Sequence, residues 1–186
     1  MGPPPDTIET ARLLLRRPSE ADAAEAFEAW TQDPEVTRYL VWPPHDSVEE
    51  TRAFFSWCDS GWEEGREFVW VFVEKASGRL VGSLAARPGA HGVDLGYLVA
   101  REWWGRGFMT EILDAVVPWW LARDGVFRVW ATCDVENLAS ARVLEKAGFQ
   151  LEGTLRRWDR HPNLGDEPRD VLCFSRIRYG STARAI

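Results

Sequence analysis

The feature that most constrains this chain is a Gly-x-Gly turn between two segments of different periodicity. Residues 92–100 predict an apolar strand, and residues 108–123 predict a helix. Gly105 and Gly107 lie between them. Such a turn directs backbone N–H groups and the positive end of the helix dipole at one point, which suits an anion such as pyrophosphate. Residues 126–133 then predict the second strand of a β-α-β unit.

Taken alone, this turn also fits an ordinary connection between a strand and a helix. It is not a Walker A loop, because no Gly-Lys-Ser/Thr follows it. It is not the dinucleotide fingerprint either, because Thr110 occupies the position of the third glycine. Arg101 and Arg106 nevertheless place two cations beside the turn. Because the Walker A lysine and the third glycine are both absent, a nucleotide-binding protein is still the least supported interpretation.

The rest of the chain alternates short strands with helices. Further strands are predicted at 11–17, 67–74, 79–87, 149–158 and 170–178. Further helices are predicted at 19–30, 47–64 and 137–147. The order βααβββαβαββ indicates a mixed α/β sheet, and Pro118 predicts a kink or an irregular turn in its helix. We expect a loose tail over 1–9, a single domain over 10–180 and a C-terminal tail over 181–186.

The composition limits the classes of partner. The 186 residues carry 22 basic and 29 acidic side chains, a net charge of −7, which argues against binding nucleic acids or anionic membranes. The three cysteines and three histidines are scattered, so we expect no disulfide framework and no metal site. No apolar stretch approaches the ~20 residues of a membrane span. We therefore expect a cytoplasmic protein.

A second pattern begins at Asn137. Asn137 and Ser140 are three positions apart at the start of a predicted helix, so they share one helix face. This spacing also fits an ordinary helix start in which Asn137 is the N-cap. Gly148 ends the helix.

Together these segments resemble the GNAT superfamily of acyl-CoA-dependent N-acyltransferases. Two motifs carry the resemblance: Trp-Gly-Arg-Gly-Phe-Met-Thr-Glu at 104–111 and Asn-x-x-Ser-x-Arg-Val-Leu-Glu-Lys-x-Gly-Phe at 137–149. Four further segments resemble the ribosomal-protein-alanine N-acetyltransferase (RimJ/RimL-type) branch: Thr-Ala-Arg-Leu-Leu-Leu-Arg at 10–16, Asp-Pro-Glu-Val at 33–36, Leu-Glu-Gly at 151–153 and Arg-Asp-Val at 169–171. The likeness spans residues 10–178.

The resemblance implies a sheet splayed between the strands at 92–100 and 126–133, with acetyl-CoA in the splay and no metal. The pantetheine arm would pair with the backbone near Leu98 and Val99, and Asn137 would hydrogen-bond it. The pyrophosphate would lie on the N–H groups of Trp104, Gly105, Arg106, Gly107, Phe108, Met109 and Thr110.

One position departs from the superfamily pattern. Glu102 stands where relatives usually carry Gln or Arg. A carboxylate facing a pyrophosphate is unfavourable, so we expect Glu102 to point away. Arg101 or Arg106 would then supply the positive charge.

The implied reaction is direct transfer of acetyl from CoA to an amine. By resemblance, Ser140 would lie near the thioester sulfur and assist the thiolate leaving group. A base must deprotonate the amine, often through water. Asp159, Asp94 and Glu152 are the candidate bases, in that order, and water without a single base is the remaining option.

Two classes of acetyl acceptor stay open: a protein N-terminus, and a small-molecule amine such as an antibiotic. We expect its pocket from residues 30–50 and 159–169. Its aromatic and acidic members would be Tyr39, Trp42, Trp158, Asp33, Asp46 and Asp159. The alternative function is a non-catalytic acetyl-CoA-binding sensor or scaffold. Eleven tryptophans, including the pair at 119–120, also suggest a homodimer seam.

Overall fold

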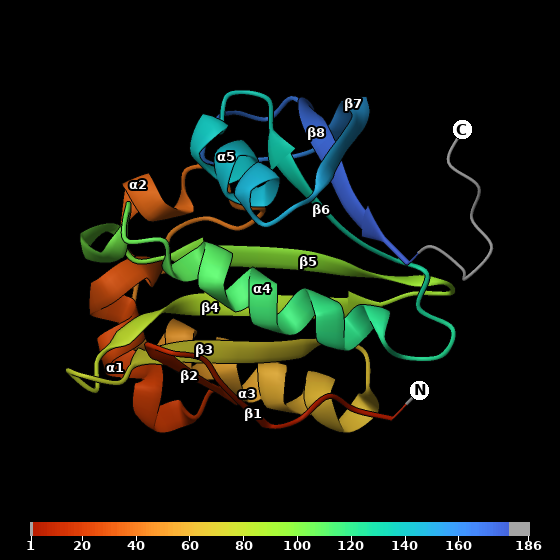
Figure 1. Ribbon diagram of the computed structural model, residues 1–186. Coiled ribbons are helices and arrows are strands. Elements are labelled where there is room, and N and C mark those ends of the chain that lie inside the picture. The colour runs from red at the N-terminus through yellow and green to blue at the C-terminus, as the bar shows by residue number, and fades with distance from the viewer. Residues whose placement is uncertain (1, 179–186) are drawn as a thin grey trace, which may run out of the picture.

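Residues 2–178 are described by the computed structural model, and they build an eight-stranded sheet in the order β1-β2-β3-β4-β5-β6-β8-β7 (Figure 1). The strands are β1 Thr7–Glu9, β2 Leu13–Arg16, β3 Phe68–Glu74, β4 Leu80–Pro88, β5 Gly92–Val99, β6 Arg128–Asp134, β7 Gln150–Asp159 and β8 Arg169–Ile177. The longer helices are α3 Val48–Glu64, α4 Phe108–Leu121 and α5 Leu138–Lys146. The predicted mixed α/β fold is confirmed.

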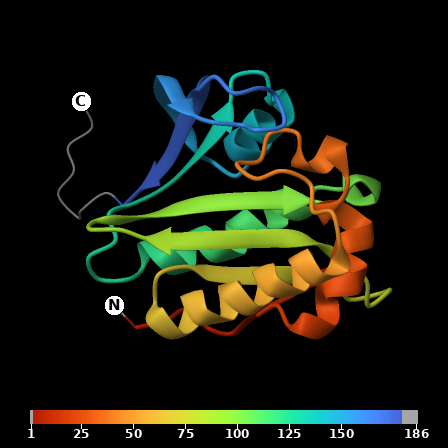
Figure 2. The ribbon, with the colours of Figure 1, turned by 180° about the vertical axis from the view of Figure 1, so that it is seen from behind.

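Helices cover both faces of this sheet. In Figure 1 α4 crosses one face of β3, β4 and β5, and α5 lies against the smaller wing made by β6, β7 and β8. Figure 2 shows α3 on the opposite face, in front of β3. The α4 side chains that face the sheet are buried, among them Ile112, Leu113 and Val116. None of the described helices is both long and apolar enough to span a bilayer.

The sheet opens between β5 and β6. These parallel strands pair only over residues 92–94 of β5 and 128–130 of β6. Beyond this point β5 stays with β4, whereas β6 stays with β8. We call the space between residues 95–99 and 131–134 the opening, and Figure 1 shows the two strands diverging there. The predicted splay of the sheet is confirmed.

The N-terminal segment differs from the expectation. Residues 7–9, predicted to lie in a loose tail, form β1 and pair with β2 in antiparallel register, Ile8 opposite Leu15. Trp70 Nε1 donates a hydrogen bond to the Pro5 carbonyl at 3.1 Å. The prediction of a loose tail is therefore wrong for this segment, because tertiary partners order a stretch that has no strand periodicity of its own. The predicted tail at 181–186 lies outside the described residues.

The first predicted helix is also broken into shorter pieces. The chain forms η1 Glu20–Asp22, α1 Ala23–Ala26 and the π-helical η2 Phe27–Thr31, followed by the short helix α2 Pro34–Thr37. Asp33 caps α2 by accepting a hydrogen bond from Glu35 N at 2.9 Å. Pro34 thus begins a helix, which its fixed φ angle favours at the first position. Pro118 lies inside α4, which continues to Leu121.

The tryptophan pair at 119–120 does not need a second copy of the chain. Trp120 is fully buried within its own chain. Trp119 packs against Trp120 with ring centroids 4.9 Å apart, and the Arg123 guanidinium lies 4.4 Å from the Trp119 ring. The physical reason for expecting a dimer seam at this pair is therefore lost.

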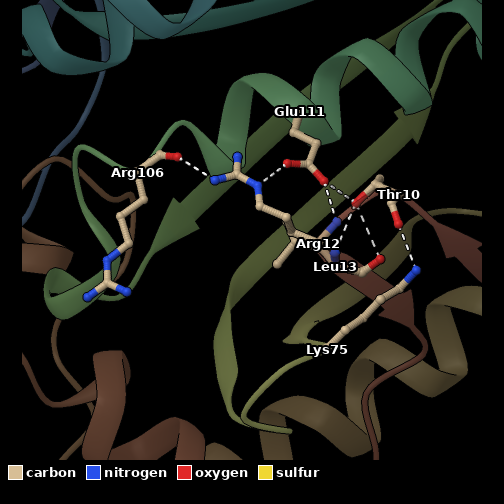
Figure 3. Close-up of polar contacts among 6 residues, drawn as sticks. All are labelled: Thr10, Arg12, Leu13, Lys75, Arg106 and Glu111. Atoms are coloured by element: carbon tan, nitrogen blue, oxygen red, sulfur yellow. Dashed lines mark hydrogen bonds and ion pairs between the residues drawn. The ribbon is translucent and has the colours of Figure 1, made fainter.

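The N-terminal segment holds the start of α4 (Figure 3). Glu111, in the first turn of α4, accepts hydrogen bonds from Thr10 Oγ1 at 2.6 Å, Arg12 N at 2.9 Å and Arg12 Nε at 2.6 Å. Arg12 also donates to the Arg106 carbonyl at 2.9 Å and lies 4.4 Å from the Phe108 ring centroid. We call these contacts the Glu111 clamp. They fix the Gly-x-Gly turn from a distant part of the chain.

We predict that Glu111→Gln destabilises the protein. Burial alone would raise the pKa of Glu111, but the bonds from Thr10 and Arg12 hold that pKa below its usual value. The stabilisation is therefore complete above the unfolded pKa and is lost as the pH falls through the folded pKa. At pH 7 the melting temperature should fall by about 3–6 °C, as expected for a loss of about 1–2 kcal/mol.

The matched control is Glu49→Gln, in an exposed ion pair with Arg52 on α3. It should change the melting temperature by less than about 1 °C. The difference between wild type and Glu111→Gln should shrink as the pH is lowered below 4, because the wild-type carboxylate is then protonated as well. Equal melting temperatures at pH 7 would contradict the clamp.

Candidate active site

The loop before α4 presents a run of backbone donors. Gly105 and Gly107 both have φ of +75°, a conformation that side chains other than glycine rarely adopt. Within residues 2–178 the N–H groups of residues 105–110 have no acceptor, whereas Trp104 N donates to the Arg101 carbonyl at 3.2 Å. We call the N–H groups of residues 105–110 the donor run, which begins one residue later than predicted. A Cβ placed on Gly105 would meet no atom within 4 Å, so this backbone is open to a ligand.

Ion pairs engage two of the charged side chains near the loop and, within the described residues, leave a third without a partner. Glu102 is held by Arg79, with N···O distances of 2.5 and 2.8 Å, so it points away as expected. Arg101 pairs with Asp33 at 2.7 Å. Arg106 forms no ion pair within residues 2–178, and its guanidinium lies 4.6 Å from the Trp103 ring centroid. Arg106 is therefore the cation available to an anion on the loop.

Successive residues of β5 direct their peptide groups alternately to β4 and to the opening. Ala100 N donates to the Val81 carbonyl at 2.8 Å, and the register places Leu98 opposite Ser83. In an antiparallel ladder, every second residue exchanges its backbone hydrogen bonds with the same neighbouring strand. Leu98, two residues before Ala100, also directs its peptide groups to β4. Leu98 therefore does not offer its peptide groups to the opening. Tyr97 and Val99 direct their N–H and C=O groups into the opening.

One of these groups is already engaged. Trp104 Nε1 donates to the Val99 carbonyl at 2.6 Å, and about half of the Trp104 side chain is exposed. The indole thus lies along the edge that a pantetheine arm would use. A ligand chain that pairs with the Val99 carbonyl must compete with this indole.

The start of α5 lies across the opening from β5. Asn137 Oδ1 accepts a hydrogen bond from Ser140 N at 3.1 Å, so Asn137 is the N-cap of α5. Ser140 Oγ lies 2.8 Å from Tyr97 Oη. Burial raises the pKa of Tyr97 above its usual value, although the bond with Ser140 opposes the rise. Tyr97 was missed from the sequence, where its only signal is a polar group among the apolar residues of β5.

The three candidate carboxylates differ in their surroundings. Glu152 accepts bonds from Ser175 Oγ and from Arg128, both at 2.6 Å, and these contacts lower its pKa. They make Glu152 a poor proton acceptor. Asp159, at the end of β7, accepts a weak hydrogen bond from Thr132 Oγ1 at 3.4 Å.

Asp94 is the carboxylate whose environment best suits a base. Burial raises its pKa, the Arg87 guanidinium opposes the rise, and the negative charge of Asp159 adds to it. Arg87 lies 3.0 Å from Asp94 and 2.6 Å from Glu67, so one guanidinium serves two carboxylates. The structure thus brings Asp94 and Asp159 into electrostatic contact. Across residues 2–178, no three His, Cys, Asp or Glu side chains are grouped as a bound metal ion requires.

A model of the GNAT acetyltransferase domain matches residues 12–150. This chain belongs to the GNAT acetyltransferase family. The protein named uncharacterized N-acetyltransferase YoaA of Bacillus subtilis is 31% identical to it over 154 residues, which cover 81% of this chain and 86% of that protein. The ribosomal protein uS5-alanine N-acetyltransferase of Escherichia coli is 23% identical over 161 residues, covering 78% and 79%.

Solved structures of the family share the fold. Mycobacterium smegmatis RimJ, in complex with CoA-disulfide, superposes with a TM-score of 0.83 at 26% sequence identity. The match covers 95% of this chain and 90% of that chain. The eight-stranded sheet and its opening are therefore those of a GNAT acetyltransferase.

Two expected walls of the acceptor pocket lie side by side in this GNAT acetyltransferase. Asn163 Nδ2 donates to the carbonyls of Thr37 at 2.6 Å and Trp42 at 2.9 Å. This brings the loop after β7 against the segment after α2. Asp33, however, borders a cavity of 340 Å³ where Arg101 neutralises it. Asp33 is therefore not free to attract a cationic acceptor.

We predict that Arg87→Gln raises the pKa of Asp94 further. Removing the nearby cation leaves burial and the charge of Asp159, which both disfavour the ionised carboxylate, opposed by the hydrogen bond from the Leu95 backbone alone. A carbon-13 NMR titration of the Asp94 carboxyl group measures this directly. Arg52→Gln, on the exposed face of α3, is the control and should leave the titration unchanged. A titration of Asp94 that is unchanged or moved to lower pH in Arg87→Gln would refute the assignment.

Proposed function

We propose that this protein transfers an acetyl group from acetyl-CoA to a primary amine. The observation that carries the proposal is the run of unpaired N–H groups at residues 105–110, which begins beside the opening of the sheet. Positive-φ glycines and the start of α4 make this loop complementary to a pyrophosphate. Arg106 adds a positive charge beside it.

The pantetheine arm would follow the open edge of β5. The peptide groups of Tyr97 and Val99 offer it the hydrogen bonds of an added strand. Asn137 uses its Oδ1 as the helix cap, which leaves its amide NH2 group to donate to the arm. Ser140, one turn into α5, would then lie near the sulfur.

For the acceptor we propose a protein N-terminus, with a small-molecule amine as the second class. One relative, the ribosomal protein uS5-alanine N-acetyltransferase, carries a ribosomal protein alanine as the acceptor in its name. Partly covered aromatic side chains at Tyr39 and Trp42 and an exposed Trp158 offer apolar contacts to the residues that follow the amine. We also propose that the reaction takes place in the cytoplasm.

The proton of the ammonium acceptor must leave before the nitrogen can attack. We propose Asp94 as the base, directly or through water, because its raised pKa makes it a stronger proton acceptor than an ordinary aspartate. Asp159, at the end of β7, would act on the reaction through its effect on the pKa of Asp94. Glu152 is excluded from this role by its bonds to Ser175 and Arg128.

We predict that acetyl-CoA binds with micromolar affinity and that Gly107→Trp abolishes binding. The indole would cover the donor run, and the substitution also strains a residue at φ +75°. Isothermal titration calorimetry measures the affinity. Gly78→Trp is the matched control, because Gly78 has φ of +70° in the β3–β4 turn, with no atom within 4 Å.

The two variants separate backbone strain from ligand contact. Gly78→Trp should retain wild-type affinity although it carries the same kind of strain. Absence of acetyl-CoA binding to the wild type would overturn the proposed function. Tight binding without thiol release, on any amine or on peptides beginning with alanine, would favour the sensor or scaffold alternative.

We predict that Asp94→Asn lowers kcat by about 10²- to 10⁴-fold, the usual contribution of a general base. The KM for acetyl-CoA should stay within about twofold, because Asp94 does not touch the donor loop. In the wild type, the raised pKa of Asp94 should place the acidic limb of kcat/KM above the pH expected for an ordinary aspartate. Asp114→Asn, on the exposed side of α4, is the control and should keep full activity.

Asp159→Asn tests the other carboxylate. It should lower kcat less than Asp94→Asn and should move the acidic limb to lower pH, because one negative charge near Asp94 is removed. The larger loss in Asp159→Asn would transfer the base role to Asp159. Full activity in both variants would leave water as the proton acceptor.

A further inference from the structure

Two hydroxyl groups meet across the opening. Tyr97 projects from the part of β5 that has separated from β6, and Ser140 lies in the first turn of α5. Their oxygens are 2.8 Å apart, and Tyr97 Oη is also 3.4 Å from the Ser140 carbonyl oxygen. Within residues 2–178 this is the side-chain hydrogen bond that joins β5 to α5.

Either oxygen of this pair can donate the hydrogen bond, and one arrangement has Tyr97 as the donor. Tyr97 keeps its proton at working pH, because burial raises its pKa. The Ser140 carbonyl is an acceptor only, so the Tyr97 proton is directed toward Ser140. When Tyr97 donates to Ser140 Oγ, the hydroxyl proton of Ser140 is left to point elsewhere, and a hydroxyl that accepts one bond donates more strongly.

Other groups near Ser140 do not compete for this role. Asn137 Oδ1 is engaged by Ser140 N at 3.1 Å. Cys133 is buried, which raises the pKa of its thiol to about 11, so it is neutral, although a hydrogen bond with Ser140 opposes the rise. A neutral thiol is only a weak acceptor. The Ser140 hydroxyl can therefore turn from Cys133 to an anion, and Tyr97 determines where that donor points.

We propose that Tyr97 is a positioning residue for the leaving group: it orients the Ser140 hydroxyl toward the sulfur of CoA and strengthens the hydrogen bond that stabilises the departing thiolate. This inference rests on the proposed function, because it requires the sulfur to reach Ser140. It adds a residue of β5 to a role that the resemblance assigns to Ser140 alone.

The step balances without a relay of protons through tyrosine. The amine nitrogen forms a bond to the acetyl carbon, the C–S bond breaks, and its electron pair goes to sulfur. The amine gives its protons to the base and to water. The thiolate accepts a hydrogen bond from Ser140 and then takes a proton from solvent, so Tyr97 and Ser140 keep their own protons throughout.

The test uses the affinity of CoA itself and needs no acceptor. If the hydroxyl pair stabilises the thiolate, the bound thiol ionises more readily than the free thiol, and CoA binds more tightly as the pH rises. By calorimetry, wild-type affinity for CoA should rise about tenfold between pH 7 and pH 9.5, as one hydrogen bond to an anion allows. Desulfo-CoA, which lacks the sulfur, should show no such rise and serves as the ligand control.

Tyr97→Phe removes only the hydroxyl. It should reduce the rise in CoA affinity to about twofold to threefold while the affinity at pH 7 stays near that of the wild type. Ser140→Ala should abolish the rise, and Tyr97→Phe should then have no further effect in the Ser140→Ala background. Ser60→Ala, which removes an exposed hydroxyl of α3 outside the site, is the control and should keep the full rise.

The outcomes distinguish a failure of the role proposed for Tyr97 from a failure of the proposed function. A full rise in Tyr97→Phe, or no rise in the wild type, would overturn the role of Tyr97 while leaving CoA binding intact. No binding of CoA at any pH would overturn the proposed function instead. Should Tyr97→Phe fail to fold, 3-fluorotyrosine at position 97 keeps the hydroxyl and makes it a stronger donor. It should enlarge the rise, and an unchanged rise would overturn the proposal.

Discussion

The Glu111 clamp is the contact on which the rest of the site depends. Glu111 lies in the first turn of α4, where a negative charge is favourable to the helix but opposes an anionic ligand. Arg12 resolves this conflict, because it neutralises Glu111 at 2.6 Å and holds the Arg106 carbonyl at 2.9 Å. With that carbonyl turned toward Arg12, the N–H of Gly107, in the same trans peptide unit, points the opposite way. The segment that enters β2 therefore sets the direction of one donor of the loop.

The opening of the sheet supplies the second half of the site. Where β5 leaves β6, the peptide groups of Tyr97 and Val99 lose the partner that a continuous sheet would give them. Such edges are costly when buried and favourable when another chain completes them. The Trp104 indole and the Tyr97–Ser140 bond lie along this edge, so side chains already mark the path that an extended ligand would take.

Local chemistry explains what could be predicted from the sequence. The cap at Asn137 and the glycines of the loop are read from neighbouring residues, and both are found where expected. The partners of Glu102 could not be predicted, because Arg79 lies 23 positions away and only the fold brings it near. The same holds for Tyr97 and Ser140, which are 43 positions apart. The direction of the Leu98 peptide groups required the register with β4, which the pattern of side chains along β5 does not reveal.

The strand order also sets the smallest fragment that can retain this architecture. The family match covers residues 12–150, but β8 lies between β6 and β7 in the sheet, so the wing has its middle strand beyond residue 150. Thr10, which bonds Glu111, and β1 lie before residue 12. A truncation made at the edges of the match would leave β6 with a bare edge and would remove β7, which packs against α5. The functional unit is therefore longer at both ends than the segment that identifies the family.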